Sequence, residues 1–250
     1  MNIVADLHTH TLHSGHATGT IYDNAHEAVN KGLKLLGISE HATGIPDACS
    51  PFSFYYIQSA ERTIEGVHML YGAEMNILND GTLSLEEKVI KLLDYGICGI
   101  HTLCYEDVGI DKNTDNVISC MKHPKVKIVS HPDDDHTPLD YDRLAKAAKD
   151  LGVALEVNNS SILKPYYRLN CFDNIAMMLK SCERYGTSIV IDSDAHSPFY
   201  VGEVGRAISF VQEAGFNEDL IINTDERKTL RFLGIDKDPD DYPIIPDVGI

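Results

Sequence analysis

Histidines and carboxylates stand in pairs along this chain at spacings that suit a metal ion. His8 and His10 are two residues apart, and so are Asp194 and His196. Residues two apart on an extended segment project to the same side, so each pair can offer two donor atoms to one ion. Imidazole and carboxylate together suit Zn²⁺, Mn²⁺ or Fe, whereas Ca²⁺ and Mg²⁺ prefer oxygen donors alone. The spacing therefore indicates a transition-metal site.

Further candidate ligands follow short apolar runs that are rich in Val and Ile and typical of parallel strands covered on both faces. These runs are residues 3–7, 35–39, 67–71, 97–100, 126–130, 153–157 and 188–191. Six of the seven are followed by a histidine or a carboxylate, and the run 153–157 is followed by Asn158 and Asn159. Together with His16 in the first connection, the candidate ligands are His8, His10, His16, His41, Glu74, His101, His131, Asp194 and His196.

The elements that must position these side chains alternate regularly along the chain. Amphipathic segments predict helices at residues 22–31, 85–95, 139–151, 171–185 and 201–214. Strands that alternate with helices favour a TIM-like α/β barrel of parallel strands, with an open doubly wound sheet as the alternative. In a parallel barrel the carboxyl ends of all strands open onto one face, so the candidate ligands converge there.

A set of nine ligands exceeds what one ion needs, because a catalytic zinc takes about four ligands including water. The excess predicts two or three ions that share a bridging carboxylate. Clustered metals stabilise both the attacking and the leaving oxygen in hydrolysis, which favours cleavage of a phosphoester. Five other histidines fall outside the pattern and are expected not to bind metal: His13, His26, His68, His123 and His136.

Composition narrows the possible partners. The 250 residues carry a formal net charge of −17, which argues against long nucleic acid and against an anionic membrane surface. The start of the chain lacks the features of a secretory signal, and no apolar run is long enough to span a bilayer, so we expect a cytoplasmic protein. The six cysteines contain no C-x-x-C pair and are expected to be free thiols.

The final segment differs from the rest. Residues 236–250 carry five aspartates against one lysine, with Pro239, Pro243 and Pro246. Because the prolines prevent a continuing helix, we predict one domain over residues 1–235, followed by an acidic tail.

The candidate residues belong to motifs that resemble those of the PHP (polymerase and histidinol phosphatase) superfamily. The motifs are D-L-H-x-H at 6–10, the later His16, His41, G-x-E ending at Glu74, S-H-P at 130–132 and S-D-x-H at 193–196. With L-E-V-N-N-S-S at 155–161, the chain is most similar to the YcdX-like branch of small stand-alone phosphoesterases. The resemblance runs from residue 3 to about 235. It implies a distorted (β/α)7 barrel with three divalent metal ions, zinc first and manganese or iron as alternatives.

The resemblance also groups the ligands. It implies one ion held by His8, His10, Glu74 and Asp194; a second that shares Glu74 and is completed by His101 and His131; and a third held by His16, His41 and His196. The family often has Asp before the histidine of the second strand, where this chain has Glu40. Some relatives are trimers, so a homo-oligomer is an expected partner arrangement.

The function that follows is hydrolysis of a small phosphate ester by a hydroxide that the metals activate. Asp194, His196 and His131 are assigned to catalysis, and Arg168 and Asn158 to substrate binding, with Asn159 and Lys164 nearby. A planar guanidinium matches phosphate, which favours Arg168. Three alternatives stay open at this point. They are a histidinol phosphatase, an amidohydrolase-type enzyme that cleaves C–N bonds, and a barrel that binds metal or ligand without catalysis.

Overall fold

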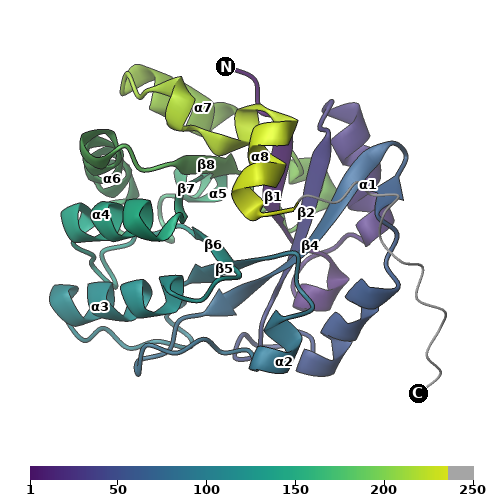
Figure 1. Ribbon diagram of the computed structural model, residues 1–250, viewed down its shortest axis with the longest axis horizontal. Coiled ribbons are helices and arrows are strands. Elements are labelled where there is room, and N and C mark those ends of the chain that lie inside the picture. The colour runs from purple at the N-terminus through teal and green to yellow at the C-terminus, as the bar shows by residue number, and fades with distance from the viewer. Residues whose placement is uncertain (236–250) are drawn as a thin grey trace.

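The strands of the computed structural model, which describes residues 1–235, form a ring of parallel strands that is surrounded by helices (Figure 1). The order around the sheet is β1-β2-β4-β5-β6-β7-β8, and the short β3 pairs antiparallel with β4. The strands are β1 Ala5–Thr9, β2 Leu35–His41, β3 Thr63–Ile64, β4 Val67–Asn76, β5 Tyr95–Gly99, β6 Val126–Val129, β7 Ala154–Asn158 and β8 Ile189–Asp192. The predicted distorted (β/α)7 barrel with seven parallel strands is confirmed.

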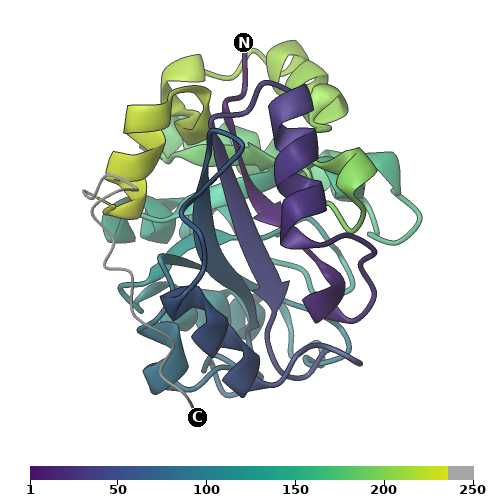
Figure 2. The ribbon, with the colours of Figure 1, turned by 90° about the vertical axis from the view of Figure 1, so that its right-hand side faces the viewer.

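Helices α1 to α6 lie in the connections between strands, and α7 and α8 follow the last strand. They are α1 Ile21–Asn30, α2 Glu87–Ile90, α3 Ile110–Met121, α4 Tyr141–Leu151, α5 Asn159–Leu163, α6 Cys171–Tyr185, α7 Gly205–Glu213 and α8 Glu226–Leu233. Short 3-10 turns add η1 Leu12–Ser14, η2 Pro51–Gln58, η3 Pro198–Tyr200, η4 Glu218–Leu220 and η5 Ile222–Thr224. Figure 1 shows α3, α4 and α6 side by side along one side of the strands, with α7 above them, and Figure 2 shows α1 in front of the strands, where it packs against β2 and β4.

Local signals explain where several helices begin and end. Thr20 and Asp23 form a reciprocal capping box at the start of α1, and the Asp140 carboxylate accepts two backbone N–H bonds at the start of α4. Helices α4 and α6 both end at a glycine with left-handed backbone angles, Gly152 and Gly186. A left-handed terminating residue is favourable for glycine because it has no Cβ.

The ring closes between its first and last strands through a narrow join. A single parallel bridge links Thr9 to Ala195, and His10 N donates to Ala195 O at 2.9 Å. Two carboxylates extend the join: Leu7 N donates to Asp192 Oδ1 at 2.8 Å, and Ser193 N donates to Asp6 Oδ1 at 3.1 Å. Side chains therefore replace part of the backbone ladder at this seam, which is why the barrel is distorted.

The barrel interior is apolar at one end and ionisable at the other. Leu70 and Glu74 share a face of β4, and Val190 shares its face of β8 with Asp192. The apolar members pack in one interior cluster with Leu233 and Ile235 from the end of the described chain, which closes the amino-terminal end of the strands. The polar side chains lie at the carboxyl ends of the strands.

Strand β1 also has apolar side chains in the interior and ionisable side chains at the mouth, but here an irregularity in the pairing register is needed. Its pairing with β2 shifts between Asp6 and Thr9, so three steps along β1 match two steps along β2. An extra residue in a strand reverses the face on which the following side chains lie. Ala5 and Leu7 pack in the apolar interior, and His8 and His10 then belong to the polar mouth.

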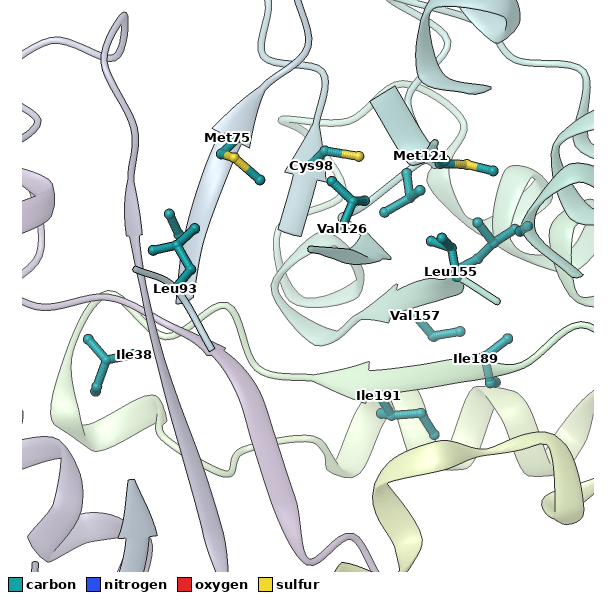
Figure 3. Close-up of a cluster of buried hydrophobic side chains, with 14 of the residues drawn as sticks. Ile38, Met75, Leu93, Cys98, Met121, Val126, Leu155, Val157, Ile189 and Ile191 are labelled. Atoms are coloured by element: carbon teal, nitrogen blue, oxygen red, sulfur yellow. The ribbon is translucent and has the colours of Figure 1, made fainter. Parts of the chain in front are cut away.

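A second apolar cluster fills the layer between the strands and the helices. It includes Ile38 of β2, Met75 of β4, Cys98 of β5 and Ile191 of β8 together with Met121 of α3, as Figure 3 shows. This outer layer holds the strand ends at fixed positions around the mouth, because close-packed side chains transmit displacement from one element to the next.

Two helix predictions need correction. The segment 85–95 forms only the four-residue α2, because Asp94 N donates to Tyr71 O and the Asp94 carboxylate binds Tyr71 N, which draws the chain into the sheet before Tyr95. The segment 201–214 becomes helical only at Gly205, because Gly202 N donates to Asp6 Oδ2. Helix α6 matches its predicted bounds.

The predicted acidic tail, residues 236–250, lies outside the described residues. Among residues 1–235, no helix combines the length and the apolar character that crossing a bilayer requires. The six cysteines are free thiols, as predicted.

Candidate metal centre

All nine candidate ligands lie at the carboxyl ends of the strands, as the strand-end rule predicts. His8, His41 and Glu74 lie at or near the carboxyl ends of β1, β2 and β4, respectively, and they face inward. The others stand in the connections that follow β1, β5, β6 and β8: His10, His16, His101, His131, Asp194 and His196. In the described residues, seven of the nine, all but His16 and His131, form three overlapping groups with mutual donor-atom distances within 4.8 Å.

The first group contains His8, His10 and Asp194. Asp194 Oδ1 lies 3.6 Å from His8 Nε2 and 3.3 Å from His10 Nε2. Glu74 Oε2 approaches the same two nitrogens at 3.3 and 3.7 Å. Four donor atoms thus surround one small volume, and they come from the four residues that the family resemblance assigns to one ion.

Glu74 also faces the opposite side of the mouth. Its second oxygen, Oε1, lies 2.8 Å from His131 Nε2 and 3.3 Å from His101 Nε2. The first oxygen, Oε2, also lies 2.8 Å from His41 Nδ1, so one carboxylate faces three imidazoles through Oε2 and two others through Oε1. A carboxylate whose two oxygens face separate sets of ligands is suited to bridge two ions.

Imidazoles gather on the outer side of the first group. His41 Nε2 lies 3.3 Å from His196 Nε2, and His10 joins these two in a second metal-capable group. The ring of His16 lies 4.6 Å from that of His196 and 5.0 Å from that of His41. His41 also belongs to a third metal-capable group with Glu74 and His101. The expected set of His16, His41 and His196 is therefore brought together, with His10 close beside it.

Hydrogen bonds fix the nitrogen that several of these histidines present. Nδ1 contacts Glu156 Oε1 at 2.7 Å in His8, Ser14 Oγ at 2.9 Å in His10 and Asn76 Oδ1 at 2.7 Å in His101. An imidazole that donates through Nδ1 keeps a lone pair on Nε2, and in each of these residues Nε2 faces the cluster. The chain therefore orients its own candidate ligands.

The donor atoms that face inward lack hydrogen-bond partners within residues 1–235. They are His8 Nε2, His10 Nε2, Glu74 Oε2 and Asp194 Oδ1, and all four are buried. Buried polar atoms are nearly always hydrogen-bonded, so a convergent set without partners needs another explanation. Divalent cations satisfy nitrogen and carboxylate oxygen at once, and the donor set fits them.

Electrostatics favour the same ligand forms. Burial, reinforced by the charges of His196 and His41, lowers the pKa of His10 well below its usual value, and burial together with Arg168 lowers that of His131 to about 4. Burial alone would raise the pKa of Glu74 and Asp194, but the surrounding histidines hold both well below the usual range. Neutral imidazoles and ionised carboxylates are the forms that bind metal.

His8 is the exception to this pattern. Burial lowers its pKa, but the charges of Glu156, Glu74 and Asp194 outweigh burial and raise the pKa well above the usual value. Without a cation among these carboxylates, a proton on His8 supplies positive charge. A cation bound at this position would therefore displace a proton from His8.

Two candidate ligands occupy backbone conformations that are uncommon for their residue types. His131 has φ of 32° and Asp194 has φ of 53°. A non-glycine residue with positive φ costs about 1–3 kcal/mol and persists where the surroundings enforce it. His131 N is held by Glu156 Oε2 at 2.7 Å, which shows how the strain is maintained.

Sequence reasoning missed the acceptors behind the ligands. Glu156 binds His8 and His131, and its signal was a single carboxylate inside an otherwise apolar strand. Ser14 accepts His41 N at 3.0 Å and donates to Glu40 Oε2 at 2.5 Å. Glu40, which stands where the family often has Asp, thus reaches His10 and His41 through Ser14.

Of the two expected substrate-binding residues, Arg168 lies beside open space at the mouth. Arg168 lines two adjoining cavities of about 240 and 450 Å³, and both also include His16 and Tyr167. Arg168 Nε lies 3.8 Å from the buried Asp133 Oδ1. Burial, against the opposing charge of Arg168, raises the pKa of Asp133 to about 6.

Asn158 is fully buried, and its amide is used within the protein. Its Nδ2 donates to Glu156 Oε2 at 3.0 Å and to Asp194 Oδ2 at 3.2 Å, while its Oδ1 accepts Ser161 N at 2.9 Å. Asn158 therefore connects β7 and α5 to a candidate ligand.

The five other histidines have different surroundings. His26, His123 and His136 pair with Glu65, Glu87 and Asp134 respectively, and the ring of His13 stacks on Tyr56 with centroids 5.8 Å apart. His68 is buried within β4, near its amino-terminal end. None of these five enters the metal-capable groups of the described residues.

Comparison with known proteins gives this arrangement a family. The PHP domain matches residues 6–151. A probable phosphatase of Thermoanaerobacter sp. (strain X514) is 38% identical over 235 residues, which are 93% of this chain and 95% of the relative. The chain belongs to the PHP domain family. A probable phosphatase of Clostridium novyi (strain NT) is 36% identical over 234 residues, again 93% of this chain and 95% of the relative.

The PHP fold also appears in a solved structure that is distant in sequence. Histidinol phosphate phosphatase of Lactococcus lactis, complexed with zinc, L-histidinol and phosphate, superposes with a TM-score of 0.61 over 87% of this chain and 95% of its own, at 14% identity. The expected PHP membership is confirmed by the domain match and the probable phosphatases, whose names agree with the YcdX-like branch.

Proposed function

We propose that this PHP-family phosphatase hydrolyses small phosphate monoesters with three divalent cations, zinc first and manganese or iron as alternatives. The observation that carries the proposal is the set of buried, inward-facing donor atoms without hydrogen-bond partners in residues 1–235. Side-chain oxygens of Glu156, Ser14 and Asn76 hold the Nδ1 atoms of three of the imidazoles, and such outer partners are typical of metal-ligating histidines.

Nine side chains would hold the cations. The proposed first set is His8, His10, Glu74 and Asp194, the second is Glu74, His101 and His131, and the third is His16, His41 and His196. When bound, such cations supply Lewis acidity and a strong nucleophile at neutral pH. The support for a shared Glu74 is that its two oxygens face different imidazoles, Oε2 those of His8, His10 and His41 and Oε1 those of His101 and His131.

The protein's own residues prepare the site for a phosphate dianion. We assign Asp194, His196 and His131 to the wall nearest the scissile bond, because the first two line the larger cavity and His131 borders Arg168. Arg168 would bind the phosphate oxygens, since its planar fork matches them and a fixed cation neutralises charge that develops in the transition state. Asn158 would act on the substrate through Asp194, which it holds.

Metal analysis paired with an activity screen tests the proposal. Protein purified without chelator should contain about three equivalents of metal and hydrolyse p-nitrophenyl phosphate, and a chelator should abolish turnover until Zn²⁺, Mn²⁺ or Fe²⁺ is restored. His131→Ala and Asp194→Ala should lose metal and activity together. His26→Ala is the matched control, because that side chain is 61% exposed and pairs with Glu65.

The same screen separates the alternatives. Turnover of amides or nucleobases without phosphate esters would favour an amidohydrolase-type enzyme. Full metal content with no turnover of any ester would favour a binding barrel, and preference for histidinol phosphate would specify the substrate. The cytoplasmic location and the homo-oligomer stay predictions, which fractionation and sedimentation measurements test.

A further inference from the structure

The larger cavity extends beyond the candidate metal ligands to a second basic side chain. It has a volume of about 450 Å³, with His16, Asp194 and His196 on one side. Ser160, Ser161, Lys164, Tyr167 and Arg168 complete its lining. A cavity of this size suits a whole small molecule rather than a phosphate group alone. The chemistry of the far wall therefore bears on what is attached to the phosphate.

Lys164 and Arg168 differ in what surrounds them. Arg168 lines both cavities and is anchored beside the His131 segment by Asp133, which assigns it to the phosphate. Lys164 lines only the larger of the two, and within residues 1–235 none of the ion pairs to a carboxylate includes it. Its Nζ instead lies 6.0 Å from the centre of the Tyr200 ring. An ammonium held over an aromatic ring keeps its charge available to an anion.

The position of Lys164 relative to the candidate metal ligands is fixed by short, well-anchored structure. Lys164 ends α5, and its N–H donates to Ser160 O at 2.9 Å. Asn158 caps the start of α5 and also holds Asp194, while Asn159 Oδ1 accepts Ala207 N at 3.0 Å. At 1.5 Å per helical residue, six residues place Lys164 roughly 9 Å along α5 from Asn158.

We infer that the substrate is a phosphate monoester whose leaving group carries a second anionic group, which binds the Lys164 ammonium. This inference rests on the proposed phosphatase function and names its substrate class. The larger cavity, with Arg168 and Lys164 both in its lining, has room for a carboxylate or a second phosphate about one six-membered ring away from the scissile phosphate. The half-buried Lys164 and the Tyr167 ring, which is 68% exposed, flank the space for that skeleton. A chain with 38 acidic and 21 basic residues would otherwise repel a polyanion.

Two esters of the same shape test the inference with the metal-loaded enzyme. We would compare kcat/KM for 4-carboxyphenyl phosphate with that for 4-carbamoylphenyl phosphate, which differ in charge at the far end. The native enzyme should prefer the carboxylate on the order of tenfold, as expected for a charge-assisted hydrogen bond. The corresponding 1,4-phenylene bisphosphate distinguishes a carboxylate from a second phosphate as the preferred anion.

Variants assign the preference to Lys164. In Lys164→Gln the ratio of the two kcat/KM values should fall to about one, and in Lys164→Glu it should invert. Lys180→Gln removes the same charge from an exposed position on α6 and should keep the native ratio. A ratio that stays native in Lys164→Gln, or that falls equally in Lys180→Gln, would overturn the inference.

The possible failures are distinguishable. If the native enzyme hydrolyses both esters at equal kcat/KM, the second anionic subsite is wrong and the phosphatase proposal stands. If the metal-loaded enzyme hydrolyses neither ester nor p-nitrophenyl phosphate, the phosphatase proposal itself fails.

Discussion

His8 Nδ1 and Glu156 Oε1 lie 2.7 Å apart, and both side chains are fully buried. The contact joins β1 to β7 across 148 residues of sequence and turns His8 Nε2 toward Glu74. The other oxygen of Glu156 accepts the backbone N–H of His131 at 2.7 Å. One carboxylate thus orients two candidate ligands that the resemblance assigns to different ions.

Glu156→Gln should therefore weaken metal binding about 10–100-fold, the usual effect of losing an outer partner of a ligating histidine. An amide NH₂ in place of Oε2 would face two donors, His131 N and Asn158 Nδ2. Competition with a fluorescent chelator measures the affinity. Glu65→Gln, at an exposed pair with His26, is the control, and equal affinities in the two variants would contradict the role of Glu156.

Arg168→Ala should raise KM for a phosphate ester about tenfold or more, because one charge-assisted contact to the phosphate is lost. Asp133→Asn should raise KM in the same direction, since it releases the anchor that lies 3.8 Å from Arg168 Nε. Steady-state kinetics of the double variant provide the decisive comparison. Effects of two residues that act as one unit are not additive, so a double variant that equals the product of the single effects would refute the coupling.

Gly99→Ala should displace side chains at the mouth of the barrel by steric overlap alone. A Cβ at this position would overlap Ser130 Oγ and lie 3.1 Å from His131 Cε1 and 3.4 Å from Glu74 Oε1. We expect a loss of metal content and a lower melting temperature, with partial recovery in Gly99→Ala/Ser130→Gly.

Gly205→Ala serves as the matched control for this change, because an added Cβ there meets nothing within 4 Å. Metal analysis and thermal melts compare the variants. Full metal content in Gly99→Ala would show that the second set of candidate ligands tolerates displacement.

Cys182 should make the fold less stable in alkali. Burial raises the pKa of its thiol from 9 to about 12, so the unfolded chain loses this proton first as pH rises above about 9. Stability is therefore unaffected by this group below pH 8 and declines above pH 9, by about 1.4 kcal/mol at pH 10.

Urea unfolding of the native protein and of Cys182→Ala at pH 7.5 and pH 10 isolates this contribution. The loss of unfolding free energy between the two pH values should be smaller in the variant by about 1.4 kcal/mol. An equal loss in both proteins would exclude Cys182 as the titrating group.

The parts of the fold that follow local rules could be predicted from sequence. Apolar runs rich in Val and Ile located the seven parallel strands, and the rule that strand ends converge brought His8, Glu74 and His131 together although they are far apart in the chain. The alternation of strands with helices favoured a barrel over an open sheet. That the sheet closes is seen only in the structure, where a bridge joins Thr9 to Ala195.

Features that depend on tertiary contacts could not be predicted in this way. The apolar pattern of 85–95 is equally compatible with a helix, and the bonds between Asp94 and Tyr71 shorten it. Strand β1 contains no glycine that would indicate its extra residue from the sequence. Glu156, Ser14 and Asn76 gain their roles only from partners placed beside them by the folded barrel.

The narrow seam between the first and last strands has a consequence for how the protein matures. Because Asp194 follows His8 by most of the length of the chain, a growing polypeptide on the ribosome has no complete first ligand set until synthesis has passed that residue. Completion of this proposed set therefore waits until one of the last segments of the described chain has been made. A truncated product that ends before β8 would contain His8, His10 and Glu74 but lack Asp194.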